Sequence, residues 1–234
     1  MSLQNFPELF NYLGFSYKKR GLYLTLKLFY LKFDNRFFDL RYGIDSSQNV
    51  SLDKLNFQIT NKTEGMEYGT IAPYFIQKIL ELVKFDTSDI FVDLGCGKGR
   101  VLLIASKFNI KKVIGIEFSP ELYLIAQKNI GNCLSNNHFN TEKINLIQKD
   151  VLDYVFNHHE TVFYSYNPFS IKILKRFCDQ IEGSLIINPR RIIIIFVNTS
   201  PTFPEILIEK GFKQIMEYDL INKKCFVYSN QVQN

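Results

Sequence analysis

"FVDLGCGKGR", residues 91–100, runs from an apolar stretch into a turn rich in glycine. Asp93 precedes three alternating glycines, Gly95, Gly97 and Gly99. Glycine tolerates positive φ and lets the backbone approach a ligand closely, and open α/β sheets bind ligands at the carboxyl ends of their strands. The run therefore predicts a strand over 89–93 that ends at a ligand-binding loop.

The rest of the chain alternates strand and helix patterns around this loop. Strands that alternate with helices form right-handed crossovers, so we expect a Rossmann-like, doubly wound α/β fold with a mostly parallel seven-stranded sheet. The last two strands have no helix between them, which predicts an antiparallel last strand. The expected strands are 89–93, 112–117, 144–149, 161–166, 191–198, 212–218 and 224–229, and the expected helices are 73–83, 98–108, 120–131, 170–182 and 202–210.

The N-terminal part has a different pattern. Residues 16–33 predict an apolar helix with a polar stripe at Lys18, Thr25 and Lys32, whereas residues 34–70 are rich in turn residues and are expected to be irregular. We therefore expect a helical extension with an irregular linker over 1–66 and the α/β domain over 67–234. The helix is too interrupted to span a bilayer. It could contact a membrane surface or a partner through 16–36, but packing on the domain is the favoured interpretation.

Three ligands compete for the glycine loop. The loop lacks the spacing of a P-loop, and it is one residue shorter than the G-x-G-x-x-G of dinucleotide folds. S-adenosylmethionine, which has no phosphate, suits the acid before the loop, since Asp93 can accept hydrogen bonds from the ligand's ammonium group. Glu117 ends the next expected strand, 22 residues after Gly95, a separation that places a carboxylate beside a ribose.

A third position lies just past the expected strand 144–149. The carboxylate of Asp150 could accept a hydrogen bond from an adenine amino group, and the N–H of Val151 could reach a ring nitrogen. Together, the three strand ends predict a nucleoside site.

These motifs resemble those of class I S-adenosylmethionine-dependent methyltransferases. The resemblance covers about residues 66–230 and rests on "VDLGCGKGR" (92–100), "VIGIEFSPEL" (113–122), "IQKDVLDY" (147–154) and "YSYNPF" (164–169). A "YGID" run at 42–45 and "VSLDKL" at 50–55 resemble a bacterial group of unassigned substrate, and the first motif is similar to that of non-SET histone-lysine methyltransferases. The family implies that the glycine loop holds the methionine part, that Glu117 binds the ribose and that Asp150 reads the adenine. "EYGTIAPY" (67–74) resembles the segment that closes over the cofactor, with Tyr68 and Thr70 as candidates.

The candidate acceptor site is Asn167-Pro168-Phe169, at the end of the expected fourth strand. It resembles the [DNS]-P-P-[YF] motif of amino-methyltransferases, in which the first side chain accepts the amine's hydrogens and the aromatic ring stacks on a planar group. One proline is missing here, which puts a planar base or amide substrate in doubt. A protein amine or a small molecule remains as the acceptor.

Composition narrows the class of protein. The 234 residues are 46% hydrophobic and 22% charged, with a formal net charge of +5, as in an ordinary globular protein. The four cysteines are widely spaced, which argues against a disulfide framework or a metal site and favours a cytoplasmic protein. A small net charge without a long basic stripe argues against a nucleic-acid partner. Oligomeric state is left open.

The leading hypothesis is an S-adenosylmethionine-dependent methyltransferase. One alternative is a non-catalytic module that binds the cofactor and acts through its basic N-terminal helix. A nucleic-acid amino-methyltransferase and an NAD-dependent oxidoreductase also remain, the latter opposed by the short glycine spacing.

Overall fold

The fold is described from a computed structural model, which covers residues 6–48, 69–167, 170–199, 203–221 and 223–231, with only the backbone for 6–20. The strands are β1 (Ile90–Leu94), β2 (Lys112–Glu117), β3 (Ile144–Gln148), β4 (Val162–Tyr166), β5 (Ile193–Val197), β6 (Lys213–Asp219) and β7 (Lys224–Ser229). The helices are α1 (Phe6–Tyr42), α2 (Pro73–Leu82), α3 (Arg100–Ala105), α4 (Pro120–Asn132), α5 (Ile171–Ile187) and α6 (Phe203–Glu209), with a short 3-10 turn over Thr141–Lys143.

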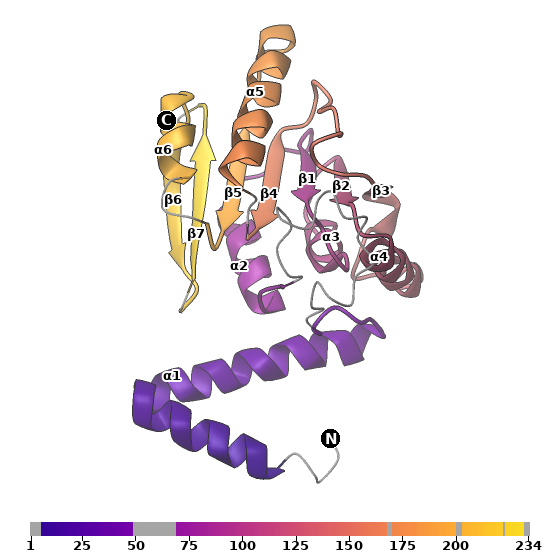
Figure 1. The fold of residues 1–234 in the computed structure, drawn as a ribbon. Helices are drawn as coiled ribbons and strands as arrows, with labels where there is room; N and C mark the ends of the chain where they lie inside the picture. Colours follow the sequence, from indigo (N-terminus) through magenta and orange to yellow (C-terminus); the bar gives the residue numbers. More distant parts are fainter. Residues whose placement is uncertain (1–5, 49–68, 168–169, 200–202, 222, 232–234) are drawn as a thin grey trace.

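The seven strands form one sheet in the order β3-β2-β1-β4-β5-β7-β6 (Figure 1). Neighbouring strands from β3 to β5 run parallel, and β7 runs antiparallel to both β5 and β6. This arrangement confirms the predicted Rossmann-like fold with an antiparallel last strand. The strand order reverses beside β1, where β2 lies on one side and β4 on the other, and ligands of such sheets bind at this switch point.

Alternating side chains of the strands bury two apolar clusters, one on each face of the sheet. Phe91 and Val162 join the cluster under α2 and α3, while Val92 and Phe163 join the cluster under α5 and α6. Because side chains alternate along a strand, Asp93 falls on the α2–α3 face, one residue before the glycine loop.

Helix α1 is longer than the sequence pattern indicates. It continues to Tyr42, so the expectation that the chain is irregular from residue 34 was wrong for 34–42. Gly21 interrupts it with φ 80° and ψ 167°, and the two halves form a V that crosses beneath the sheet at the ends of the parallel strands (Figure 1). Gly21 takes this conformation because it has no Cβ.

Among the described residues, no helix is both long and apolar enough to cross a membrane.

Candidate functional site

The glycine loop between β1 and α3 is fixed to the end of β2. The N–H groups of Gly95 and Cys96 both donate to the carbonyl of Ile116, each at 2.9 Å. Gly95, Gly97 and Gly99 all have positive φ, at 82°, 53° and 81°. Side chains with a Cβ rarely adopt this backbone, so the sharp turn requires the three glycines.

Asp93 places a carboxylate directly under this loop. It is 2% exposed, and its Oδ2 atom has no hydrogen-bond partner among the described residues. Burial raises the pKa of Asp93 well above its ordinary value, and the nearby Glu117 carboxylate raises it further. An isolated buried carboxylate of this kind needs a cation or a hydrogen-bond donor.

Tyr164 lies opposite Asp93 on the neighbouring strand β4, in register with it. Its hydroxyl is also buried without a hydrogen-bond partner in the part of the chain that the structure describes. Burial raises the pKa of Tyr164, with a smaller contribution from Asp93. Tyr164 could not be recognised from the sequence, because a tyrosine inside an apolar strand has the pattern of a core residue.

Glu117 ends β2 and turns back to the glycine loop. Its Oε2 accepts from the N–H of Gly97 at 2.8 Å, and its Oε1 accepts from the N–H of Ser119 at 2.9 Å. Burial raises the pKa of Glu117, although these backbone donors oppose the increase. Each carboxylate oxygen has a further lone pair, so the group can still accept from two ribose hydroxyls.

The arrangement fits S-adenosylmethionine. The unpartnered Oδ2 of Asp93 suits the cationic ammonium of the methionine part, and Glu117 suits the ribose at the next strand end. A pyrophosphate would instead meet two buried carboxylates. These two residues lie at neighbouring strand ends, at the switch point of the sheet.

The other residues expected to bind the cofactor show only local contacts or lie outside the described residues. Asp150 follows β3, and its Oδ1 accepts from the N–H of Leu152 at 2.8 Å, so the carboxylate also caps a turn beside half-buried Val151. The hydroxyl of Thr70 donates to the carbonyl of Ile71 at 3.3 Å. Tyr68 lies outside the described residues, as does the boundary expected at 66.

The expected acceptor residue Asn167 follows β4 and lies at an unusual cluster of backbone conformations. The described non-glycine residues with positive φ are Asn167, Asn198 and Ile221, at 49°, 58° and 78°. Asn198 links the residue after β4 to the start of β7, because its Nδ2 donates to Oδ1 of Asn167 and its N–H donates to the carbonyl of Lys224. Residues held in such conformations concentrate at ligand and active sites. Pro168 and Phe169 lie outside the described residues.

Lys98 and Arg100, inside the glycine motif, bind the N-terminal extension. Lys98 pairs with Asp45 at 3.0 Å, and Arg100 donates to Ser46 at 2.8 Å and pairs with Asp39 at 3.5 Å. Both cations are 1% exposed. These pairs could not be recognised from the sequence, because the partners lie 53 to 61 residues apart in the chain.

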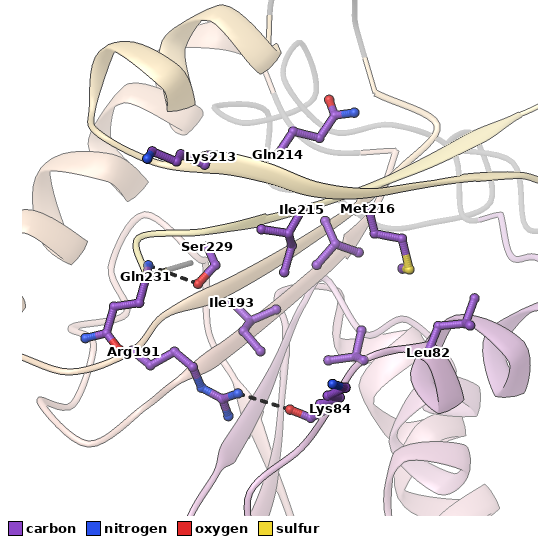
Figure 2. Close-up of a pocket in the computed structure, with 12 residues that line it drawn as sticks. Leu82, Lys84, Arg191, Ile193, Lys213, Gln214, Ile215, Met216, Ser229 and Gln231 are labelled. Atoms are coloured by element: carbon purple, nitrogen blue, oxygen red, sulfur yellow. Dashed lines mark hydrogen bonds between the residues drawn. The ribbon is translucent and has the colours of Figure 1, made fainter. Parts of the chain in front are cut away.

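A hollow of about 660 Å³ lies elsewhere in the molecule, between the end of α2 and strands β5, β6 and β7 (Figure 2). Its floor is apolar, with Ile193, Ile215 and Met216, and the guanidinium of Arg191 donates to the carbonyl of Lys84 at its margin. It opens at the amino ends of the parallel strands, the edge opposite Asp93 and Glu117, so it is separate from the candidate site.

Two curated methyltransferases are similar in sequence to part of this chain. The chain is 39% identical over 72 residues to a protein-lysine N-methyltransferase of Saccharolobus islandicus, a match that covers 28% of this chain and 45% of that protein. It is 34% identical over 89 residues to an uncharacterised RNA methyltransferase of Protochlamydia amoebophila, covering 38% of this chain and 20% of that protein. The chain thus spans less than half the length of these curated relatives.

Solved structures share the architecture at low identity. A candidate O-methyltransferase from Nostoc punctiforme has a TM-score of 0.54 at 11% identity, covering 67% of this chain and 56% of that one. A candidate S-adenosylmethionine-dependent methyltransferase from Listeria monocytogenes has a TM-score of 0.50 at 15% identity, covering 68% and 96%. These likenesses show the fold.

The family model of the histone methylation protein DOT1 matches residues 47–163, half of the chain. The matched range contains the glycine loop, both buried carboxylates and Asp150, and S-adenosylmethionine is the cofactor. The protein therefore belongs to the DOT1 histone methylation family of S-adenosylmethionine-dependent methyltransferases.

Proposed function

We propose that the protein transfers a methyl group from S-adenosylmethionine to an amine, with a protein lysine as the favoured acceptor. The observation that carries this proposal is the buried carboxylate of Asp93, whose Oδ2 lacks a partner among the described residues. A bound ammonium group would supply the missing positive charge and donor at this position. Glu117 would hold the ribose beside it, with Gly95, Gly97 and Gly99 lining the methionine part.

S-adenosylmethionine supplies a methyl group bound to a positively charged sulfur. The residues of the chain then have to align an acceptor nitrogen whose lone pair is free. Asn167 follows β4, the strand next to β1, so it lies at the same edge of the sheet as Asp93. Its Oδ1 can accept an N–H of the amine in addition to that of Asn198, which would orient the lone pair toward the methyl group.

Two kinds of acceptor have support from relatives. The DOT1 family and the lysine methyltransferase of Saccharolobus islandicus favour a protein lysine. The relative from Protochlamydia amoebophila, an RNA methyltransferase, makes RNA the second candidate. The small net charge of +5 favours the protein, because RNA binding depends on neutralising many phosphates.

The test is methyl transfer from tritiated S-adenosylmethionine into fractionated cell extract. We expect label that protease releases and nuclease does not, and that is recovered as methyllysine after acid hydrolysis. Label released by nuclease would transfer the assignment to RNA. Binding of S-adenosylhomocysteine with no transfer to any fraction would support the non-catalytic alternative and overturn the proposal.

Variants separate binding from transfer. Glu117→Gln should weaken S-adenosylhomocysteine binding by roughly tenfold or more, because one buried hydrogen bond to a charged group contributes about 1.5–3 kcal/mol. Asn167→Ala should leave this binding unchanged and lower kcat by at least about tenfold. Asn137→Ala, on an exposed turn after α4, is the matched control and should change neither quantity.

A further inference from the structure

The second half of α1 exposes an apolar face. Its members are large aliphatic and aromatic residues with exposed fractions from 38% to 72%. We call this the outer face of α1, and it consists of Leu22, Tyr23, Leu26, Phe29, Tyr30, Phe33, Phe37 and Leu40. Monomeric proteins rarely expose so many large apolar side chains together unless the patch binds something.

The helix is anchored mainly by another side, although the ring of Tyr30 contacts Tyr74 of α2 edge to face, with the ring centres 6.2 Å apart. Leu31 and Phe38 are buried with the core of the domain, and the hydroxyl of buried Thr25 donates to the carbonyl of Gly21. Members of the outer face recur at steps of three and four from Leu22 to Leu40, with Tyr23 and Tyr30 each next to another member, and so lie on one broad side of the helix. The helix is therefore apolar on two sides, and the domain covers mainly one of them.

The charges beside the outer face are basic. Lys27, Arg36 and Arg41 lie on the same stretch of helix, and Nζ of Lys27 lies 5.8 Å from the ring centre of Tyr23. The two acids of this stretch are directed to the domain. Asp34 accepts from the N–H of Tyr74 at 2.9 Å, and Asp39 pairs with Arg100.

We propose that the outer face of α1 binds the surface of an anionic lipid bilayer, with the helix lying in the plane of the interface. Phenylalanines, tyrosines and leucines would enter the boundary between head groups and acyl chains, while the basic side chains reach the lipid phosphates. The charge on the helix complements such a surface, which attracts basic segments. Because α1 crosses the carboxyl edge of the sheet, this binding would turn the cofactor edge toward the bilayer (Figure 1).

A second copy of the chain fits the outer face less well. Arg36 stands three residues after Phe33, a position that a coiled-coil seam would fill with an apolar side chain. The face is also wider than such a seam, since Tyr23, Tyr30 and Phe37 broaden it. Pairing two copies would bring their basic margins together, which is repulsive.

The experiment is co-sedimentation of the full chain with vesicles of phosphatidylcholine alone and of phosphatidylcholine mixed with phosphatidylglycerol. We expect binding to the anionic vesicles that falls as salt is added, because salt screens exposed charges. The double variant Leu26→Ser with Leu40→Ser should bind at least about tenfold more weakly, since it removes two exposed apolar side chains from the interface. The matched control is Ile186→Ser with Ile187→Ser at the end of α5, where the exposed fractions are 83% and 65%.

A charge variant tests the second half of the proposal. Lys27→Glu with Arg36→Glu should abolish the preference for anionic vesicles, whereas Lys175→Glu with Arg176→Glu on α5 should retain it. Unchanged thermal melting would show that the variants are folded. Equal binding by wild type and the leucine variant, or no binding to anionic vesicles, would overturn the proposal. A dimer seen by light scattering and lost in the leucine variant, without vesicle binding, would assign the face to a second copy.

Discussion

Asp93→Asn should make the ligand-free protein more stable while it weakens cofactor binding. Because burial raises the pKa of Asp93, the folded protein keeps a proton that the unfolded chain has released. The free energy of unfolding therefore falls as pH rises, starting near the ordinary aspartate pKa of about 3.9 and ending at the folded pKa. One extra proton in the folded state gives a slope of about −1.4 kcal/mol per pH unit, and asparagine removes it.

For each pH unit between the ordinary aspartate pKa of about 3.9 and the raised folded pKa, the variant should thus gain about 1.4 kcal/mol relative to wild type. In a chain of this size each kcal/mol moves the melting temperature by roughly 2–4 °C, so the difference should widen by about 3–6 °C. The assay is thermal melting without ligand across this pH range. Asp179→Asn, an exposed carboxylate bonded to Lys210, controls for the lost negative charge.

A bound ligand should reverse the order of stability, so that wild type becomes more stable than Asp93→Asn. S-adenosylhomocysteine at ~100 times its dissociation constant should stabilise wild type by about 2.7 kcal/mol and Asp93→Asn by much less. Parallel melting curves of the two ligand-free proteins across pH would show that Asp93 is already ionised in the fold. That result would refute the argument from burial.

Two further predictions concern the support of the glycine loop. Arg100→Ala should destabilise the fold by roughly 3–5 kcal/mol, because it removes the cation that pairs with the buried Asp39 carboxylate and leaves that charge, among the described residues, with only its hydrogen bonds from Ser46 and Ser47. Cleavage near residues 43–48 should also become faster in limited proteolysis, and equal rates would contradict the anchoring role. Gly115→Ala should cost about 1–3 kcal/mol in thermal melting, because a Cβ there would lie 2.4 Å from Cδ1 of fully buried Leu102. The control is Gly131→Ala in α4, where a Cβ would meet nothing within 4 Å. This change should raise the free energy of unfolding by up to about 1 kcal/mol. Equal effects of the two changes on the melting temperature would disprove the packing argument.

The sheet could be predicted from the sequence because each strand is a short apolar run between turn residues. Runs such as Ile193–Val197 are buried on both faces, and this pattern has few alternatives in an α/β chain. The candidate cofactor edge could be proposed for the same reason, since Asp93 and Glu117 stand at the ends of such runs. Local patterns therefore located both carboxylates.

Long-range partners could not be predicted in this way. Arg100 and Lys98 have the pattern of solvated charges after a glycine turn, yet their partners come from the end of α1. The turn-rich runs at 45–51 and 59–69 led to the expectation of an irregular segment from residue 34 onward, but Asp34 and Asp39 are directed to the domain and the helix continues to Tyr42. Tertiary contacts decided these positions.

The same contacts also bear on how the protein should be cut for experiments. An expressed fragment that begins at residue 67 would retain the seven strands that the structure describes and still lose Asp39, Asp45 and Ser46, which Arg100 and Lys98 contact from across that boundary. The two cations beside the glycine loop would then lose both the carboxylates that pair with them and the segment that keeps them buried. A fragment chosen from the fold alone would have a damaged glycine loop, so a poor affinity of that fragment for S-adenosylmethionine would not test the proposed site.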